Sequence, residues 1–174
     1  MAIKVGEHPP RYPRLPSRLR SLIGPDQEKL SKGLQSEDHG LGVGAFAYYR
    51  QIVENQKDRL IEEILKVVRL HNPNQKLVNE LEEAKHEDRF TSAVEEIKQA
   101  IPQALLINGH NPLGLLHKAL SEGLHAGTDA ECLEIAQDFR VVLSDFSERL
   151  HTALNGRPRL VAAESVRVWD GQGD

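Results

Sequence analysis

The sequence predicts an all-α protein, a helical bundle of four to six helices with one long central helix. Two long stretches, at residues 43–68 and 133–154, carry apolar residues at the 3.6-residue period of an amphipathic helix. Prolines and Asn-Gly pairs punctuate the chain around these stretches and separate shorter helical segments. No alternation of strands and helices is visible, which disfavours the nucleotide-binding α/β folds. Long amphipathic helices joined by brief loops pack most economically as a bundle.

Composition restricts the class of protein further. The chain has 174 residues, enough for one domain with a core of its own. No apolar run approaches the roughly 18 residues that cross a bilayer, so we expect no contact with a membrane. The first residues lack the apolar segment of a secretory signal, and there is one cysteine, so we expect a cytoplasmic protein without disulfides. A single cysteine also excludes cysteine-ligated zinc, and we expect neither a metal nor a cofactor.

Residues 1–39 are expected to form a proline-rich N-terminal arm. Its prolines make residues 1–25 extended or turn-like, with short helices at 16–23 and 26–37. Its clustered basic residues are Arg11, Arg14, Arg18 and Arg20. An exposed basic arm suits nucleic acid or an acidic protein partner, although the net charge of −4 opposes constitutive binding to long nucleic acid. The alternative is that the apolar residues of the arm pack on the body while the arginines stay solvated.

Residues 40–155 are expected to form the bundle itself. The stretch at 42–71 contains no proline and predicts the long central helix. An Asn-Pro-Asn sequence ends this helix, because the residue before a proline is disfavoured in helical dihedrals. Two shorter helices are predicted at 75–84 and 90–100.

Capping signals predict two further helices. Asn111 can accept hydrogen bonds as an N-cap, and the proline after it suits the first turn of a helix. Thr128 and Glu131 fit the capping box that opens the last helix, and an Asn-Gly pair ends that helix at residue 155. The remaining residues, 156–174, are expected to form an irregular C-terminal tail with a β-leaning stretch that becomes ordered on contact.

Two polar features lie near the start of the predicted central helix. The glycine cluster at 40–44 opens the helix, where free N–H groups could hold a phosphate. Alternatively, its small residues let a neighbouring helix approach closely. Arg50 and Glu54 are one turn apart, so they can pair with each other or face one polar pocket. The guanidinium of Arg50 would suit a carboxylate or a phosphate.

Histidines gather in the helix that follows Asn111. His117 and Ser121 share a face, Lys118 lies between them in sequence, and His125 stands at the helix end. Histidine can act as an acid, a base or a ligand near neutral pH. Neither a His-Glu-x-x-His metal motif nor a G-x-S-x-G hydrolase motif is present. We therefore expect a pocket centred on His125 and lined by the other three, in which Arg50 anchors an anion beside Glu54.

Two segments of the chain resemble a known family. These are LGVGAFAYYRQIVE at 41–54, and LSEGLH at 120–125 followed by ECL at 131–133. They are similar to a bacterial family of domains of unknown function that is usually grouped with the HEPN superfamily of helical bundles. With the lead-in KVGEHPP, the resemblance extends over residues 4–155.

The resemblance implies a bundle of four or five helices that forms a homodimer. Catalytic HEPN domains are metal-independent RNases that carry an arginine, four to six intervening residues and then a histidine. His125 matches the histidine, but Lys118, Ala119 and Leu120 occupy the positions where the arginine would stand. Attack by a 2'-hydroxyl needs a base and a cation for the phosphate. Lys118, or Arg50 from another helix, would have to supply that cation.

Three functions follow as hypotheses. The first is a HEPN-like module, non-catalytic or weakly catalytic, that binds an anionic ligand such as a nucleotide or RNA, or a protein partner, and acts in regulation. The second is a metal-independent endoribonuclease with His125 as the general base. The third is a purely structural module whose N-terminal arm and tail contact another protein.

Overall fold

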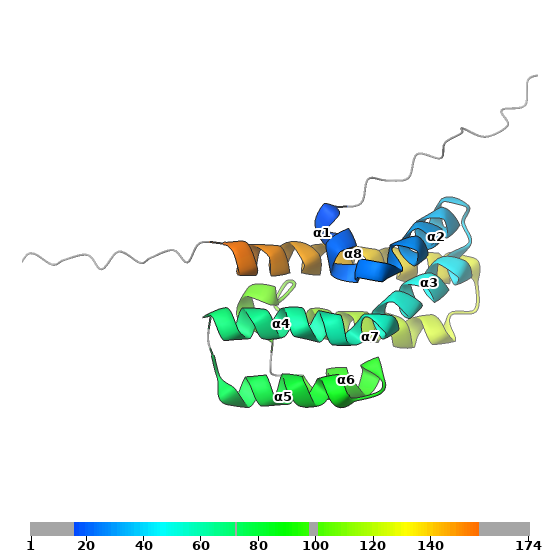
Figure 1. The fold of residues 1–174 in the computed structure, drawn as a ribbon. Coiled ribbons are helices and arrows are strands. Elements are labelled where there is room, and N and C mark those ends of the chain that lie inside the picture. Colours follow the sequence, from blue (N-terminus) through cyan, green and yellow to red (C-terminus); the bar gives the residue numbers. More distant parts are fainter. Residues whose placement is uncertain (1–15, 72, 98–100, 157–174) are drawn as a thin grey trace, which may run out of the picture.

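The computed structural model describes residues 16–71, 73–97 and 101–156, and this part of the chain is all-α (Figure 1). The fold class predicted from the sequence is therefore confirmed. Within the described residues the extended pairing is limited to one isolated bridge between Ile107 and His110. None of the described helices is both long enough and apolar enough to span a membrane.

Eight α-helices and two short 3-10 helices make up the described residues. In chain order they are α1 (Ser17–Ile23), η1 (Gly24–Asp26), α2 (Gln27–Asp38), α3 (Gly42–Asn55), α4 (Lys57–His71), α5 (Gln75–His86), α6 (Phe90–Glu96), η2 (Gln103–Leu105), α7 (Pro112–His125) and α8 (Asp129–Asn155). The short helices predicted at 16–23 and 26–37 are α1 and α2. The helix predicted at 90–100 is α6, which ends at Glu96; residues 98–100 lie outside the described residues.

Helix α8 is the centre of the bundle. It packs against α1, α3, α4 and α7, and Figure 1 shows it extending along the length of the molecule. Its aromatic residues Phe139 and Phe146 are fully buried, as are Ile64 and Leu65 of α4. Burial of side chains of this size stabilises a fold by about 1.5–3 kcal/mol each. Both predicted N-caps are formed: Asn111 opens α7, and the Thr128–Glu131 capping box opens α8.

The single long helix predicted at residues 42–71 is wrong in one respect, because the stretch forms two helices, α3 and α4, that run in different directions (Figure 1). Gln56 lies between them, and its amide donates a hydrogen bond to the buried carboxylate of Asp26 at 2.8 Å. Asn55 donates to the same carboxylate at 3.3 Å, and the ammonium of Lys57 donates to the backbone oxygen of Lys85 at 2.8 Å. The apolar period continues through the break, so the sequence pattern contains no sign of it.

The first helices of the chain belong to the bundle. Leu19 and Ile23 of α1 are fully buried, and α2 packs along α3 through Leu30 and Leu34. The described part of the predicted arm therefore packs on the body, and its two arginines, Arg18 and Arg20, stay at the surface. Residues 1–15 of the arm lie outside the described residues, as do residues 157–174 of the tail.

Glycines allow α3 to approach its neighbours closely. A Cβ at Gly42 would lie 1.9 Å from the carbonyl oxygen of Asp129 in α8. The backbone N–H of Val43 donates to the carboxylate of Asp129 at 2.9 Å. A carboxylate of the protein thus caps the start of α3, where the sequence had also suggested a phosphate. Within the glycine cluster it is Gly42 that allows close helix packing, whereas a Cβ at Gly40 would meet open space.

Candidate functional site

Four of the six predicted site residues lie on one face of α7, and that face points away from α3. Gly123 marks the opposite face, because a Cβ there would lie 2.3 Å from the ring of Phe46 in α3. The four residues are His117, Lys118, Ser121 and His125. At 100° per residue they lie about 120–220° around the helix axis from Gly123. The predicted grouping of these four side chains is therefore present as a surface of α7.

This α7 face is open to solvent. Lys118, Ser121 and His125 are exposed and His117 is half-buried. Lys118 pairs with Glu122 one turn away at 3.7 Å, where both side chains are more than half exposed. Such a pair contributes little free energy, so the ammonium of Lys118 can reorient toward a ligand.

The other two predicted residues are not brought to this face. Glu54 lies at the end of α3 and accepts a hydrogen bond from the backbone N–H of Phe90 at 3.4 Å. Since Phe90 is the first residue of α6, the carboxylate stabilises a helix start. Arg50 lies one turn after Phe46, the residue that contacts Gly123. The backbone of α7 therefore lies between this part of α3 and the face with His125.

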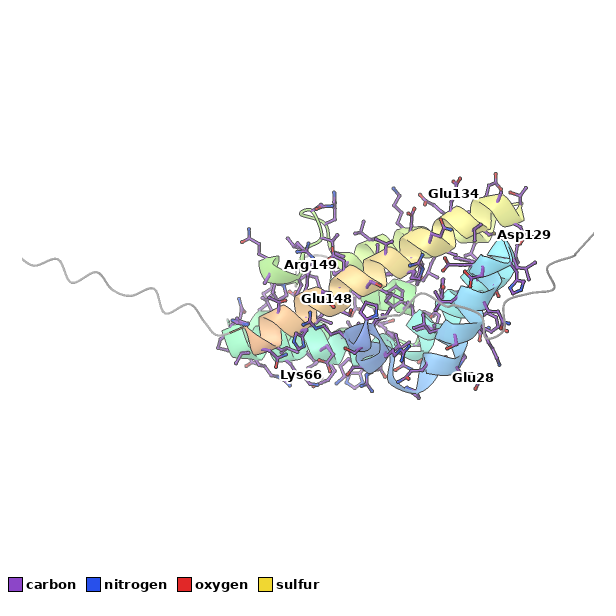
Figure 2. The ribbon with its side chains drawn as sticks, turned by 90° about the horizontal axis from the view of Figure 1, so that it is seen from above. Glu28, Lys66, Asp129, Glu134, Glu148 and Arg149 are labelled. Atoms are coloured by element: carbon purple, nitrogen blue, oxygen red, sulfur yellow. The ribbon has the colours of Figure 1, made fainter. Side chains whose placement is uncertain are left out.

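A cavity lies elsewhere, where α1 rests against α4 and α8. Its volume is about 430 Å³. Figure 2 shows α1 beside α8 near Glu148, with Lys66 of α4 at the same side of the bundle. Polar side chains that line it include Arg18, Ser21, Arg59, Ser147, His151 and Asn155. None of the six residues predicted from the sequence lines this cavity.

Three helices position the basic groups of the cavity. Arg18 of α1 pairs with Glu148 of α8 at the surface. Arg59 of α4 donates one N–H to the backbone oxygen of Ser21 at 2.9 Å, which holds its guanidinium under α1. A guanidinium has five N–H groups, so most of the donors of Arg59 remain for a ligand.

The imidazole of His151 and the carboxylate of Glu63 also line the cavity and affect its charge. The amide of Asn155 contacts Nδ1 of His151 at 3.2 Å; when it donates there, Nε2 of His151 carries the proton and can donate to a ligand. Glu63 also lines the cavity, but it pairs with Lys66 at 2.7 Å. The cavity thus presents two guanidinium groups and an imidazole against one carboxylate that already has a cation.

Sequence reasoning missed most of this cavity. Arg59 and His151 lie far apart in the chain, and neither stands in a recognisable motif. The one available signal was Arg18, which belongs to the basic residues of the predicted arm. Three helices have to pack before these side chains meet, so spacing along the sequence does not reveal them.

A second polar cluster, at the junction of α2, α3 and α8, is paired within itself. The hydroxyl of Tyr49 donates to the carboxylate of Glu37. Arg140 donates to the same carboxylate through Nε at 3.0 Å and through Nη2 at 3.3 Å. Burial, together with the carboxylate of Glu37, raises the pKa of the Tyr49 hydroxyl. These groups satisfy one another, and we assign them to stability.

The comparisons with known proteins add no information about the function of this cavity. Comparison of the chain with protein-family models, with curated proteins and with solved structures finds no match. Among the described residues, no group of three or more His, Cys, Asp and Glu side chains is placed to hold a metal ion. The function of the α1/α4/α8 cavity is therefore argued from its own side chains.

Proposed function

We propose that the protein is a HEPN-like, non-catalytic binding module that takes an anionic, phosphate-bearing ligand of nucleotide size in the α1/α4/α8 cavity. The observation that carries the proposal is the convergence of Arg18, Arg59 and His151 on one cavity of about 430 Å³. Cavities of about 300–1,000 Å³ are typical of small-molecule sites. The all-α bundle and the two sequence segments at 41–54 and 120–125 support the HEPN-like part of the proposal.

The chemistry of the lining favours phosphate. A planar guanidinium binds two oxygens of a phosphate or carboxylate at once, and charged hydrogen bonds of this kind are about twice as strong as neutral ones. Arg59 is held in place by its bond to the Ser21 carbonyl, so little side-chain entropy is lost when a ligand binds. Arg18 must exchange its contact with Glu148 for the ligand, and that exposed contact is weak.

Calorimetric titration with ATP, ADP and inorganic phosphate tests this proposal. In Arg18→Gln, loss of one charged hydrogen bond is expected to weaken nucleotide binding about tenfold or more. Arg20→Gln is the matched control, because Arg20 is exposed on the same helix and does not line the cavity. Binding should also weaken as salt rises. Absence of binding by all three probes, or equal affinities in the two variants, would contradict the proposal.

The α7 face favours a second candidate function, a metal-independent endoribonuclease. Lys118 and His125 share this face two turns apart, about 10 Å along the axis, so a cation and a base can face one RNA strand. Incubation of the protein with labelled RNA in EDTA tests it. Cleavage that His125→Ala abolishes and that Arg18→Gln leaves intact would favour the RNase. No cleavage, or cleavage unchanged in His125→Ala, rejects it.

We also propose that the module works in the cytoplasm as a homodimer. The two exposed residues Leu41 and Val43 flank Gly42 at the start of α3, where it contacts α8, and the exposed Leu124 follows Gly123, which contacts α3. Exposed apolar side chains gathered at one end of a molecule are typical of an interface. Light scattering should show a dimer that Leu124→Lys dissociates. Leu70→Lys, on exposed α4 surface, is the control.

A purely structural role in binding another protein is the remaining alternative. Light scattering that shows a monomer at all concentrations would reject the homodimer. If the anion proposal fails as well, the exposed apolar end is left as the surface for a different protein. Because dimer dissociation and nucleotide binding are measured separately, each proposal can fail without the other.

A further inference from the structure

A second cavity, independent of the proposed anion site, lies between α4, α5 and η2. Its volume is about 300 Å³, and its walls are mostly apolar side chains, among them Val67, Val68, Leu77 and Pro102. Gln103 and Ala104 of η2 line it and are exposed, so they lie at its rim. An apolar cavity that opens to water binds a complementary apolar group favourably.

The cavity lies beside the C-terminal end of α8. His71 lines the cavity, and its ring Nε2 donates a hydrogen bond to the backbone oxygen of Ala153. The short helix η2 also packs against α8. Helix α8 ends at Asn155, two residues after Ala153, and Figure 1 shows this end of α8 next to the end of α4. The chain that follows α8 therefore starts next to the cavity.

The sequence after α8 contains suitable apolar groups. Residues 157–174 lie outside the described residues. They include Val166, Val168 and Trp169, the last being the one tryptophan of the chain. Thirteen residues from Gly156 span at most about 45 Å when extended, so Trp169 can reach any point of the cavity mouth. A tether of this length gives a local concentration in the millimolar range, which favours binding within one chain.

We infer that the indole of Trp169 binds in the α4/α5/η2 cavity, so that the C-terminal tail docks on its own bundle. An indole is a large apolar group with one N–H donor, and buried indoles need an acceptor for that donor. The side-chain oxygen of Gln103 at the rim supplies one. The apolar walls of the cavity match the apolar faces of the ring.

Tryptophan fluorescence of the full chain tests the inference, because the single tryptophan makes every signal report on Trp169. Acrylamide should quench Trp169 in the full chain less than in a free peptide of residues 157–174, by about threefold or more, since the cavity covers both ring faces. Emission should also shift to shorter wavelength. In Ala104→Arg, a long charged side chain at the rim should return quenching to the level of the peptide.

The controls separate docking from unfolding and from exchange between chains. Ala47→Arg changes an exposed alanine on α3 and should leave the protection of Trp169 unchanged. Circular dichroism should show the same helix content in both arginine variants. Equal quenching in the full chain and the peptide would overturn the inference, as would protection that survives Ala104→Arg. Protection that increases with protein concentration would instead place the tail in the cavity of a second copy.

Discussion

Two arginine–glutamate pairs connect α8 with the first helices of the chain, and their surroundings differ. Arg140 donates through two nitrogens to Glu37 of α2, whose side chain is only 8% exposed. Arg18 of α1 pairs with Glu148, and these side chains are 41% and 42% exposed. Breaking a buried, bidentate pair leaves a charge without its partner and costs several kcal/mol, whereas an exposed pair contributes about 0–1 kcal/mol.

The difference separates a closed junction from an open one. At the closed junction of α2, α3 and α8, Tyr49 and Arg140 fully occupy the carboxylate of Glu37. At the open junction of α1, α4 and α8, Arg18 and Arg59 border a cavity. Substitutions at the closed junction should therefore change stability, and substitutions at the open junction should change binding. Four predictions follow, and those at Gly42, Arg140 and Arg18 test this division.

The largest effect is expected from Gly42→Ala at the closed junction. The added Cβ would lie 1.9 Å from the carbonyl oxygen of Asp129 and 2.4 Å from the backbone nitrogen of Leu133. Both atoms belong to the backbone of α8, so α3 and α8 must move apart. We expect a loss of about 3 kcal/mol or more in the free energy of unfolding, measured by urea denaturation.

Gly114→Ala is the matched control for this prediction. Gly114 lies in the first turn of α7, where a Cβ would lie 3.7 Å from the Cβ of Asn111, an ordinary contact. Alanine favours the helix, so the free energy of unfolding should rise by up to about 1 kcal/mol. Similar losses in both variants would show that helix approach is not what Gly42 provides.

The next largest effect is expected from Arg140→Gln. The carboxylate of Glu37 then keeps only the neutral hydroxyl of Tyr49 as a side-chain hydrogen-bond donor, and it stays largely buried. We expect a loss of about 2 kcal/mol in the free energy of unfolding. Urea denaturation of this variant, of Glu37→Gln and of the double variant measures the coupling between the two residues. Additive losses would show that Arg140 and Glu37 do not stabilise each other, which would contradict the description of this junction as closed.

The fold was predictable from the sequence to a greater extent than the site. Apolar periodicity and the caps at Asn111 and Thr128 are local signals, and they predicted the helix class and the starts of α7 and α8. The break at Gln56 was not predictable, because it depends on a hydrogen bond to Asp26, thirty residues earlier in the chain. Local patterns carry no information about such distant partners.

The candidate site shows the same limit. His117 and Ser121 were correctly expected on one face, because a helix fixes their spacing. The expected approach of Arg50 to His125 depended on how α3 and α7 pack, and Gly123 turns the other face of α7 toward α3. Residues of one helix could be grouped from the sequence, and residues of different helices could not.

A smaller effect on the free energy of unfolding is expected when the pH is lowered, because the buried carboxylate of Asp26 at the α3–α4 break becomes protonated. Burial alone would raise the pKa of Asp26, but hydrogen bonds from Lys29, Gln56 and Asn55 outweigh it and lower that pKa. A carboxyl whose pKa is lower in the folded state stabilises the fold above its unfolded pKa of about 3.9. That contribution is lost as the pH falls through the folded pKa.

Asp26→Asn isolates this contribution. The variant should be less stable than the natural chain at neutral pH, and the difference should shrink below about pH 4 as Asp26 becomes protonated. Urea denaturation at a series of pH values measures it. A difference that stays constant down to acid pH would mean that the charge of Asp26 does not stabilise the fold.

The smallest effect on stability is expected from Arg18→Gln at the open junction, and it makes the sharpest contrast with Arg140→Gln. Both variants remove an arginine that pairs with a glutamate between α8 and one of the first helices, and both replace it with the same shorter, uncharged polar side chain. Since Arg18 and Glu148 are both solvated, the free energy of unfolding should change by less than about 0.5 kcal/mol. The same variant should lose nucleotide affinity about tenfold. A stability loss equal to that of Arg140→Gln would mean that the first pair also holds helices together, and the division between a closed and an open junction would fail.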